Sequence, residues 1–269
     1  LTGETGSLFG EGLDMDFEGK RVVVGAPAFN SNTGYVEIYD YDENANTWTS
    51  NVIINGPHTQ SFFGHAVSMN WDGDRVAISA NAASNVYIYD YNGGWSLSNV
   101  ISNVSSTNFG HAISLAADAG NRICVGTPDE NMIYIYEETP SGGFVETYSN
   151  VGTDLVSELP VNEAGTVTVT VNSEYNGYGF SVQMAAFGEH VIVGAPGTRL
   201  TQIDSTNSTA TTVYNTTIPD TPKKVGTFGS YQIGMVRMLT CPTGGSWSSG
   251  VTQHGSVIQG AVDYNVYLE

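Results

Sequence analysis

Three carboxylates at alternate positions form the first candidate site for chemistry. Asp14, Asp16 and Glu18 are followed directly by Gly19. Every second side chain of a tight loop points inward, so these oxygens can converge on calcium, which prefers about six to eight hard oxygen ligands. A calcium loop would end with a further acidic residue at or beside position 21. The sequence has Arg21 there, whose charge opposes a bound cation. The pattern predicts calcium as a cofactor. The alternative is an ordinary polar β-turn whose Asp side chains bond their own backbone.

Two histidines form a second candidate site. His65 and His111 each follow a Phe-Gly pair, and Glu11 follows an earlier pair in the same way. If the strands that begin there lie around a common axis, the two imidazoles are neighbours and could bind a metal with Glu11 as third ligand. The alternative is that these side chains fill a central channel and hydrogen-bond to water or backbone.

Familiar catalytic motifs do not occur in the sequence. There is no nucleophile elbow, no phosphate-cradling glycine loop and no His-Glu-x-x-His helix. The 27 acidic residues offer many carboxylate pairs, but nothing selects one pair for glycoside cleavage. We therefore predict that the protein is not an enzyme.

The elements that carry these side chains repeat along the chain. Each of four aromatic-glycine pairs is followed, after a nearly constant interval, by a short closing triplet. The pairs are Phe9-Gly10, Phe63-Gly64, Phe109-Gly110 and Tyr178-Gly179. The triplets are Gly25-Ala26-Pro27, Ser79-Ala80-Asn81, Gly126-Thr127-Pro128 and Gly194-Ala195-Pro196. Repetition of this kind dictates architecture, so it is interpreted before any single motif.

Each triplet leads into a run with a period of two, such as Tyr35-Val36-Glu37-Ile38-Tyr39, and then into a turn and an aromatic residue. Such alternation indicates β-strand, and no segment has a helical apolar stripe. One repeat is therefore four antiparallel strands, and the chain is predicted to be an all-β, β-propeller-like domain over 1–269. A β-solenoid or a sandwich is the alternative. The predicted repeats are about 9–60, 61–106, 107–144 and 178–250.

The opening Phe-Gly pair, the Val22-Val23-Val24-Gly25-Ala26-Pro27 closure and the strand after it resemble FG-GAP repeats. These repeats form the propeller of integrin α-subunit heads. The resemblance covers most of 9–140, then 178–196 and about 230–250. Integrin-like propellers usually close with seven blades and have calcium loops in some of them. Only four repeats are visible in this sequence, so we expect either a four- or five-bladed ring, closed by terminal strands, or an incomplete ring that is part of a larger protein. The resemblance also implies an extracellular, cell-surface or virion-surface location.

The charge balance limits the partners. A formal net charge of −19, from 8 basic and 27 acidic residues, argues against binding nucleic acid or an anionic membrane through a basic face. No apolar run is long enough to span a bilayer. Because the surface is rich in Thr, Asn and Gly, a place in a larger extracellular assembly is also predicted.

Two expansions interrupt the regular spacing, at 145–177 and 197–229, and Thr166–Val171 within the first predicts an extra hairpin. The first expansion connects the last strand of one blade to the first strand of the next, and the second connects the second and third strands of one blade. In an antiparallel blade these two kinds of connection lie on the same face of the propeller, so both expansions should lie on that face. We predict a non-enzymatic recognition or adhesion module that binds a protein or glycan on a cell or particle surface through this face. The alternative is a structural component of a virion or cell-surface fibre that uses the propeller as a docking platform.

The predicted ligand-binding residues are aromatic or arginine side chains in or beside these expansions, because such side chains dominate binding hot spots. They are Tyr175, Tyr178, Arg199 and Tyr214. The alternative for the tyrosines is that they pack beneath a long loop.

Overall fold

The structure, a computed structural model, describes residues 1–152, 157–159, 167–169, 177–196, 199–200, 231–232, 235–242, 245–253 and 258–259. Within these ranges the chain forms four antiparallel sheets of four or five strands each, called blades 1 to 4 below. Blade 1 contains β1 (Leu13–Met15), β2 (Arg21–Ala26), β3 (Tyr35–Asp42) and β4 (Thr47–Asn55). Blade 2 contains β5 (Phe63–Met69), β6 (Arg75–Ala80), β7 (Asn85–Tyr91) and β8 (Trp95–Ser102).

Blade 3 contains β9 (Ala112–Leu115), β10 (Arg122–Thr127), β11 (Met132–Glu138) and β12 (Phe144–Val151). Blade 4 contains β15 (Ser181–Met184), β16 (His190–Ala195), β19 (Met235–Thr240), β20 (Thr252–Gln253) and β21 (Ile258–Gln259). Because β12 runs to Val151, the third repeat extends beyond the predicted limit of 144. The helical segments are short. α1 (Phe29–Asn32) follows a closing triplet, whereas η1 (Asn81–Ala83) and η2 (Pro128–Glu130) each begin at the last residue of one. None of these described helical segments is long and apolar enough to cross a bilayer.

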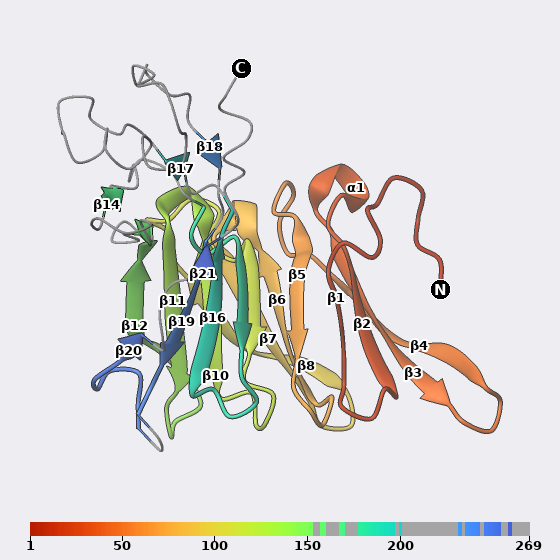
Figure 1. Cartoon of the computed structure of the whole chain (residues 1–269). Helices are drawn as coiled ribbons and strands as arrows, with labels where there is room; N and C mark the ends of the chain where they lie inside the picture. The colour runs from red at the N-terminus through yellow and green to blue at the C-terminus, as the bar shows by residue number, and fades with distance from the viewer. Residues whose placement is uncertain are drawn as a thin grey trace.

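The blades stand side by side with their first strands innermost (Figure 1). β1 contacts β5, β5 contacts β9, and β9 contacts β15. Each pair of neighbouring blades encloses its own apolar cluster. Phe63, Phe109 and Tyr178, the aromatics of three opening pairs, are fully buried, one in each cluster. This arrangement confirms the predicted all-β propeller class over the sandwich and solenoid alternatives.

The glycines of the repeat explain how closely the blades approach. A Cβ on Gly25 of blade 1 would lie 1.9 Å from the carbonyl oxygen of Gly64 in blade 2. A Cβ on Gly126 of blade 3 would lie 2.0 Å from the carbonyl oxygen of Gly179 in blade 4. In blades 1 and 3 the first glycine of the closing triplet therefore packs on the opening glycine of the following blade, where a Cβ would clash with backbone. Blade 2 has Ser79 at this position, so a small side chain is accepted between blades 2 and 3.

Strand burial follows the position within a blade. The second strands β2, β6 and β10 are largely buried on both faces, as their Val- and Ile-rich sequences predict. The apolar sequence of β16 predicts the same, but Ile192 is 42 % exposed, so this strand is covered on one face only. The difference has a simple cause: among the described residues, no further blade packs on the outer face of blade 4.

A short described hairpin lies within the first expansion, and another joins the two ends of the second. β13 (Ser157–Leu159) pairs with β14 (Val167–Val169), which confirms the hairpin predicted from Thr166–Val171. β17 (Arg199–Leu200) pairs with β18 (Tyr231–Gln232) between β16 and β19. Figure 1 shows β14, β17 and β18 beyond the upper end of the sheets, the end at which α1 lies. The loops that join the first and second strands lie at the lower end.

Candidate functional site

The candidate site is a row of side chains at one repeat position, directly after the opening glycine of each blade. The row consists of Glu11, His65, His111 and Phe180, from blades 1 to 4 in order. The Glu11 Oε1 lies 2.7 Å from the His65 Nδ1. The His65 and His111 rings have centroids 5.2 Å apart, and the His111 and Phe180 rings 4.7 Å apart. The first strands of successive blades contact one another, so side chains at the same position of each repeat lie next to each other and form a continuous row.

The Glu11–His65 contact orients the imidazole ring. A carboxylate that accepts a hydrogen bond from Nδ1–H holds the neutral ring in the tautomer whose Nε2 carries a lone pair. That nitrogen is then able to accept a proton. The side chains of Glu11 and His65 are 34 % and 21 % exposed, so the pair is accessible while partly shielded from water.

A pocket of about 370 Å³ opens beside this pair. This volume lies at the lower end of the range for small-molecule sites. Apolar and amide side chains surround Glu11 and His65. The lining residues are Leu8, Glu11, Phe62, His65, Asn81, Ala82 and Asn108. The Asn81 Nδ2 donates a hydrogen bond to the Asn108 Oδ1 at 2.7 Å, which directs the amide NH₂ of Asn108 away from Asn81.

Left-handed backbone also occurs at this place. Leu8, Phe62 and Asn108 each precede an opening pair and have φ of 57°, 54° and 61°. Asn tolerates this left-handed conformation, but Leu and Phe adopt it at a cost of about 1–2 kcal/mol. Strained residues of this kind are enriched at functional sites. The side chains of Leu8 and Phe62 both line the pocket.

His111 is held in its neutral form. Burial lowers the pKa of His111 below its ordinary value of 6.5, and the neighbouring charge of His65 lowers it further. Asp129 and Glu11 act in the opposite direction and do not outweigh these two effects. The row therefore contains a neutral imidazole next to the one paired with Glu11.

This shift predicts how stability depends on pH. The folded protein binds a proton at His111 less readily than the unfolded chain, so the stabilisation is complete above pH 6.5 and is lost as the pH falls below it. His111→Phe, which keeps a ring beside Phe180, should flatten the fall in unfolding free energy between about pH 7 and 5. Urea unfolding at several pH values measures this. The control His58→Gln changes an exposed histidine and should keep the wild-type slope; an unchanged slope in His111→Phe would contradict the prediction.

The predicted calcium ligands do not converge in the structure. The two carboxylate oxygens of Asp14 accept from the backbone N–H of Met15 and Met69. The Asp16 Oδ1 accepts from two backbone N–H groups of its own turn, and Glu18 pairs with Lys20. Among the described residues, no three His, Cys, Asp or Glu side chains are arranged to hold a metal ion. Calcium at this turn stays a prediction without geometric support, as does a metal at Glu11, His65 and His111.

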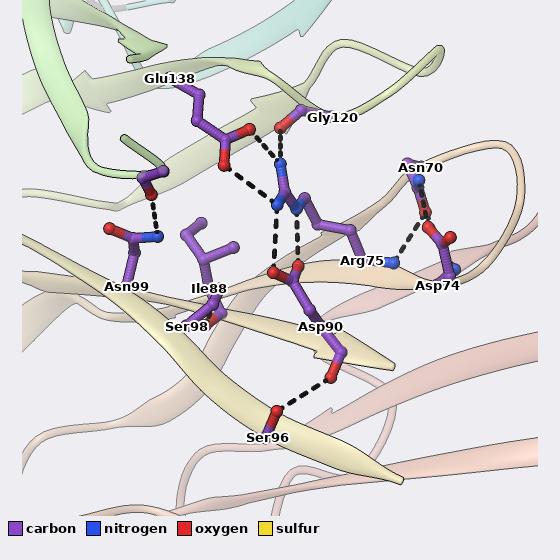
Figure 2. A network of polar contacts seen from close by, with 11 residues as sticks. Asn70, Asp74, Arg75, Ile88, Asp90, Ser96, Ser98, Asn99, Gly120 and Glu138 are labelled. Carbon is purple, nitrogen blue, oxygen red and sulfur yellow. Dashed lines mark hydrogen bonds and ion pairs between the residues drawn. The ribbon is translucent and has the colours of Figure 1, made fainter. Parts of the chain in front are cut away.

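An arginine network lies beside the turn where calcium was predicted and beside the matching turns of blades 2 and 3. Arg21, Arg75 and Arg122 begin the second strands of blades 1, 2 and 3, and each faces an acid on the third strand of its own blade. Arg75 makes a bidentate pair with Asp90 at 2.6 and 3.1 Å (Figure 2). It also binds Glu138 of blade 3 at 2.6 and 3.2 Å.

Each arginine also reaches the next blade. A guanidinium nitrogen donates to the carbonyl oxygen of Gly73 from Arg21, of Gly120 from Arg75 and of Gly188 from Arg122. These three glycines hold the turn between the first and second strands of the following blade. The arginines thus link successive blades. This structural role was missed from the sequence, where Arg21 was considered only as an opponent of calcium.

Loss of this link should be costly. Arg75→Met leaves Asp90 and Glu138 without their partner, and we expect the unfolding free energy to fall by about 3 kcal/mol, as for other largely buried ion pairs. Chemical denaturation of the variant measures this. Lys20→Met is the matched control, because it breaks an exposed pair with Glu18 and Glu43 and should leave the midpoint nearly unchanged. Equal midpoints for the two variants would show that the network contributes nothing.

The predicted ligand-binding residues are not brought together. Tyr178 is fully buried, and its hydroxyl donates to the Asn150 Oδ1 at 2.9 Å. The prediction of a surface anchor is therefore wrong for Tyr178: it fills the blade 3–blade 4 core at the position of Phe63 and Phe109. Arg199 begins β17, but its side chain lies outside the described part of the structure, as do Tyr175 and Tyr214.

Comparison with known proteins supports the fold class. No protein-family model matches the chain, and no curated protein matches it. Among solved structures, a protein of Bacteroides uniformis named provisionally as a 6-phosphogluconolactonase is 8 % identical, with a TM-score of 0.52. A protein of Bacteroides fragilis with the same provisional name is 10 % identical, with a TM-score of 0.50. Each alignment covers 92 % of this chain and 54 % of the other, so this chain spans about half the length of these neighbours.

Fold and neighbours together define a multi-blade β-propeller-like protein. Both neighbours are named as enzymes, and this contradicts the prediction of a non-enzymatic recognition or adhesion module, together with its structural alternative. The prediction went wrong because it treated missing sequence motifs as missing chemistry. A propeller assembles its site from distant repeats, so no contiguous motif is required. At about 10 % identity the likeness shows the fold alone.

Proposed function

We propose that this chain is a hydrolase that opens small lactones or esters in the pocket beside Glu11 and His65. The observation that carries the proposal is the 2.7 Å contact between the Glu11 carboxylate and the His65 Nδ1 at the wall of a pocket of small-molecule size. A histidine oriented in this way by a carboxylate is a typical general base.

The reaction needs only groups that the pocket provides. The Nε2 of His65 takes a proton from a water molecule as the water oxygen forms a bond to the carbonyl carbon, which gives a tetrahedral oxyanion. Collapse of this intermediate breaks the carbon–oxygen bond of the ester, and the imidazolium returns its proton to the leaving alkoxide. Glu11 stabilises the imidazolium in between. The amide NH₂ of Asn108 is the donor best suited to the oxyanion.

The comparisons add limited support. The two neighbours with TM-scores of 0.50 and 0.52 are named for lactone hydrolysis, which is the reaction class that the Glu11–His65 pair suits. Since fold does not determine function, the proposal depends on the site. The chain matches about half of each neighbour, so any activity of a complete relative is likewise only a proposal for this chain.

We also infer that the blades are FG-GAP-like repeats in an extracellular protein. What supports the repeat assignment is the reason for the motif: the opening aromatic fills the core between blades, and the closing glycine packs on the opening glycine of the next blade. No family model adds to this inference.

The test of the hydrolase proposal is direct. The purified chain is offered a panel of five- and six-membered lactones and short aryl esters, and acid release is followed by pH-stat titration. We expect turnover above the buffer rate for at least one lactone or ester. If neither class of compound is hydrolysed faster than in buffer alone, the proposal is wrong.

A further inference from the structure

We propose that this pocket selects uncharged acyl substrates and discriminates against phosphorylated ones; this inference rests on the proposed hydrolase function. The starting point is the lining. Among the described residues, its only titratable side chains are Glu11 and His65, and its remaining polar side chains are the amides of Asn81 and Asn108. A phosphate group is normally bound by Arg or Lys side chains or by a row of backbone N–H groups. The described lining contains no Lys or Arg.

The cations of the described chain have other partners. Arg21, Arg75 and Arg122 pair with acids and with the first turn of the following blade, at the end of the sheets opposite the pocket. Lys20 pairs with two glutamates near the same turns. The remaining described guanidinium belongs to Arg237, which is buried in blade 4 beside the ring of Tyr178. None of these described cations is available to neutralise an anion at the pocket.

Carboxylates dominate the surroundings of the pocket. Glu11 lines it, and the charge of Asp129 acts on His111, the next side chain in the row. Glu130 accepts a hydrogen bond from the backbone N–H of Thr107 at 2.8 Å, one residue before the lining residue Asn108. The whole chain carries a formal charge of −19. A negative field of this kind repels anions and lowers their local concentration at the site.

The neutral part of the lining suits a neutral ligand. Leu8, Phe62 and Ala82 supply apolar walls, and the two asparagines supply donors and acceptors without charge. A phosphate carries a charge of about −1.5 to −2 at neutral pH. Placing it near Glu11 would require burial of like charges without a compensating cation, which strongly disfavours binding. The same acyl group without phosphate meets no such obstacle.

The experiment compares two substrates that share the reacting bond and differ in charge. Hydrolysis of D-glucono-1,5-lactone and of its 6-phosphate is followed at pH 7 by pH-stat titration, at about 20 mM and at about 300 mM salt. We expect kcat/KM to be at least about tenfold higher for the neutral lactone at low salt. The preference should shrink at high salt, because screening weakens the repulsion.

A charge-reversal variant makes the cause specific. Asp129→Lys changes an exposed acid close to the row and should raise kcat/KM for the phosphorylated lactone several-fold, with little effect on the neutral one. The matched control is Asp72→Lys, an equal change in net charge at an exposed turn on the opposite end of blade 2, which should alter neither value.

The outcomes separate the two proposals. Equal or faster hydrolysis of the phosphorylated lactone overturns the substrate inference and leaves the hydrolase function standing. Hydrolysis of neither lactone, nor of any compound in the wider panel, overturns the hydrolase function, and the substrate inference falls with it. A preference for the neutral lactone that responds equally to Asp129→Lys and Asp72→Lys contradicts a local origin of the repulsion.

Discussion

Replacing His65 with alanine is expected to lower kcat/KM for lactone hydrolysis by about 10²- to 10⁴-fold, the usual contribution of a general base. The reason is that no other side chain that lines the described pocket combines a lone pair with an orienting carboxylate. The fold should survive, since the His65 side chain is 21 % exposed and lies outside the blade cores. Thermal unfolding of the variant checks that expectation separately from the assay.

Glu11→Gln tests the role of the carboxylate. Glutamine keeps the size of the side chain but accepts less strongly and can also donate, so the His65 tautomer is no longer fixed and the imidazolium is less stabilised. We expect a smaller loss, about tenfold to a hundredfold, that falls mainly on kcat. His58→Ala is the control, because this histidine is exposed and is not among the residues that line the pocket. Full activity in His65→Ala would remove His65 from the mechanism.

Much of this site could be predicted from the sequence once the repeat was recognised. The shared position after the opening glycine predicted that Glu11, His65 and His111 are neighbours, and they are. In the fourth repeat the residue at this position is Phe180, whose ring packs against His111. It was overlooked because phenylalanine is not a metal ligand. The pocket could not be predicted, because its other walls come from Leu8, Phe62 and the segment after β6, whose positions depend on the packing of blades.

For Tyr178, the position within the repeat predicts burial better than the neighbouring expansion does. Its position next to an expansion suggested a binding residue, whereas its place in an opening pair indicates a core aromatic. The structure agrees with the repeat, as Phe63, Phe109 and Tyr178 are all fully buried. In a repeat protein the index of a residue within the unit is therefore a better guide to its burial than the loops that flank it.

The arginine network marks a limit of prediction from one sequence. Arg21 and Arg75 were visible, but the acids that they bind lie on the next strand of the blade or in another blade. Such pairs depend on strand register, which a single sequence specifies only through its alternation. The charge of Arg21 argued against calcium in the first turn, yet it gave no indication of what the arginine binds.

Gly126→Ala is expected to destabilise the protein by about 3 kcal/mol, the upper part of the usual range for overpacking, because a Cβ at this position would lie 2.0 Å from the carbonyl oxygen of Gly179. The obstacle is backbone in the next blade, so no rotamer change can relieve it, and blades 3 and 4 must move apart. This would loosen the cluster around Tyr178 and Trp247. Chemical denaturation, followed by tryptophan fluorescence, measures the loss.

Gly194→Ala is the matched control, because Gly194 has the same position in the repeat at the end of the described row of blades. A Cβ there would meet the Ser181 Oγ at 2.3 Å, the rotatable end of a side chain, and otherwise only atoms at 3.7 Å or more. Rotation of Ser181 relieves this contact, so the loss should stay below about 1 kcal/mol. The two variants change the same residue type at the same index and differ in whether a further blade follows. Equal destabilisation would mean that glycine is needed for the conformation of its own strand, and that close contact between blades is not the reason for glycine at this position.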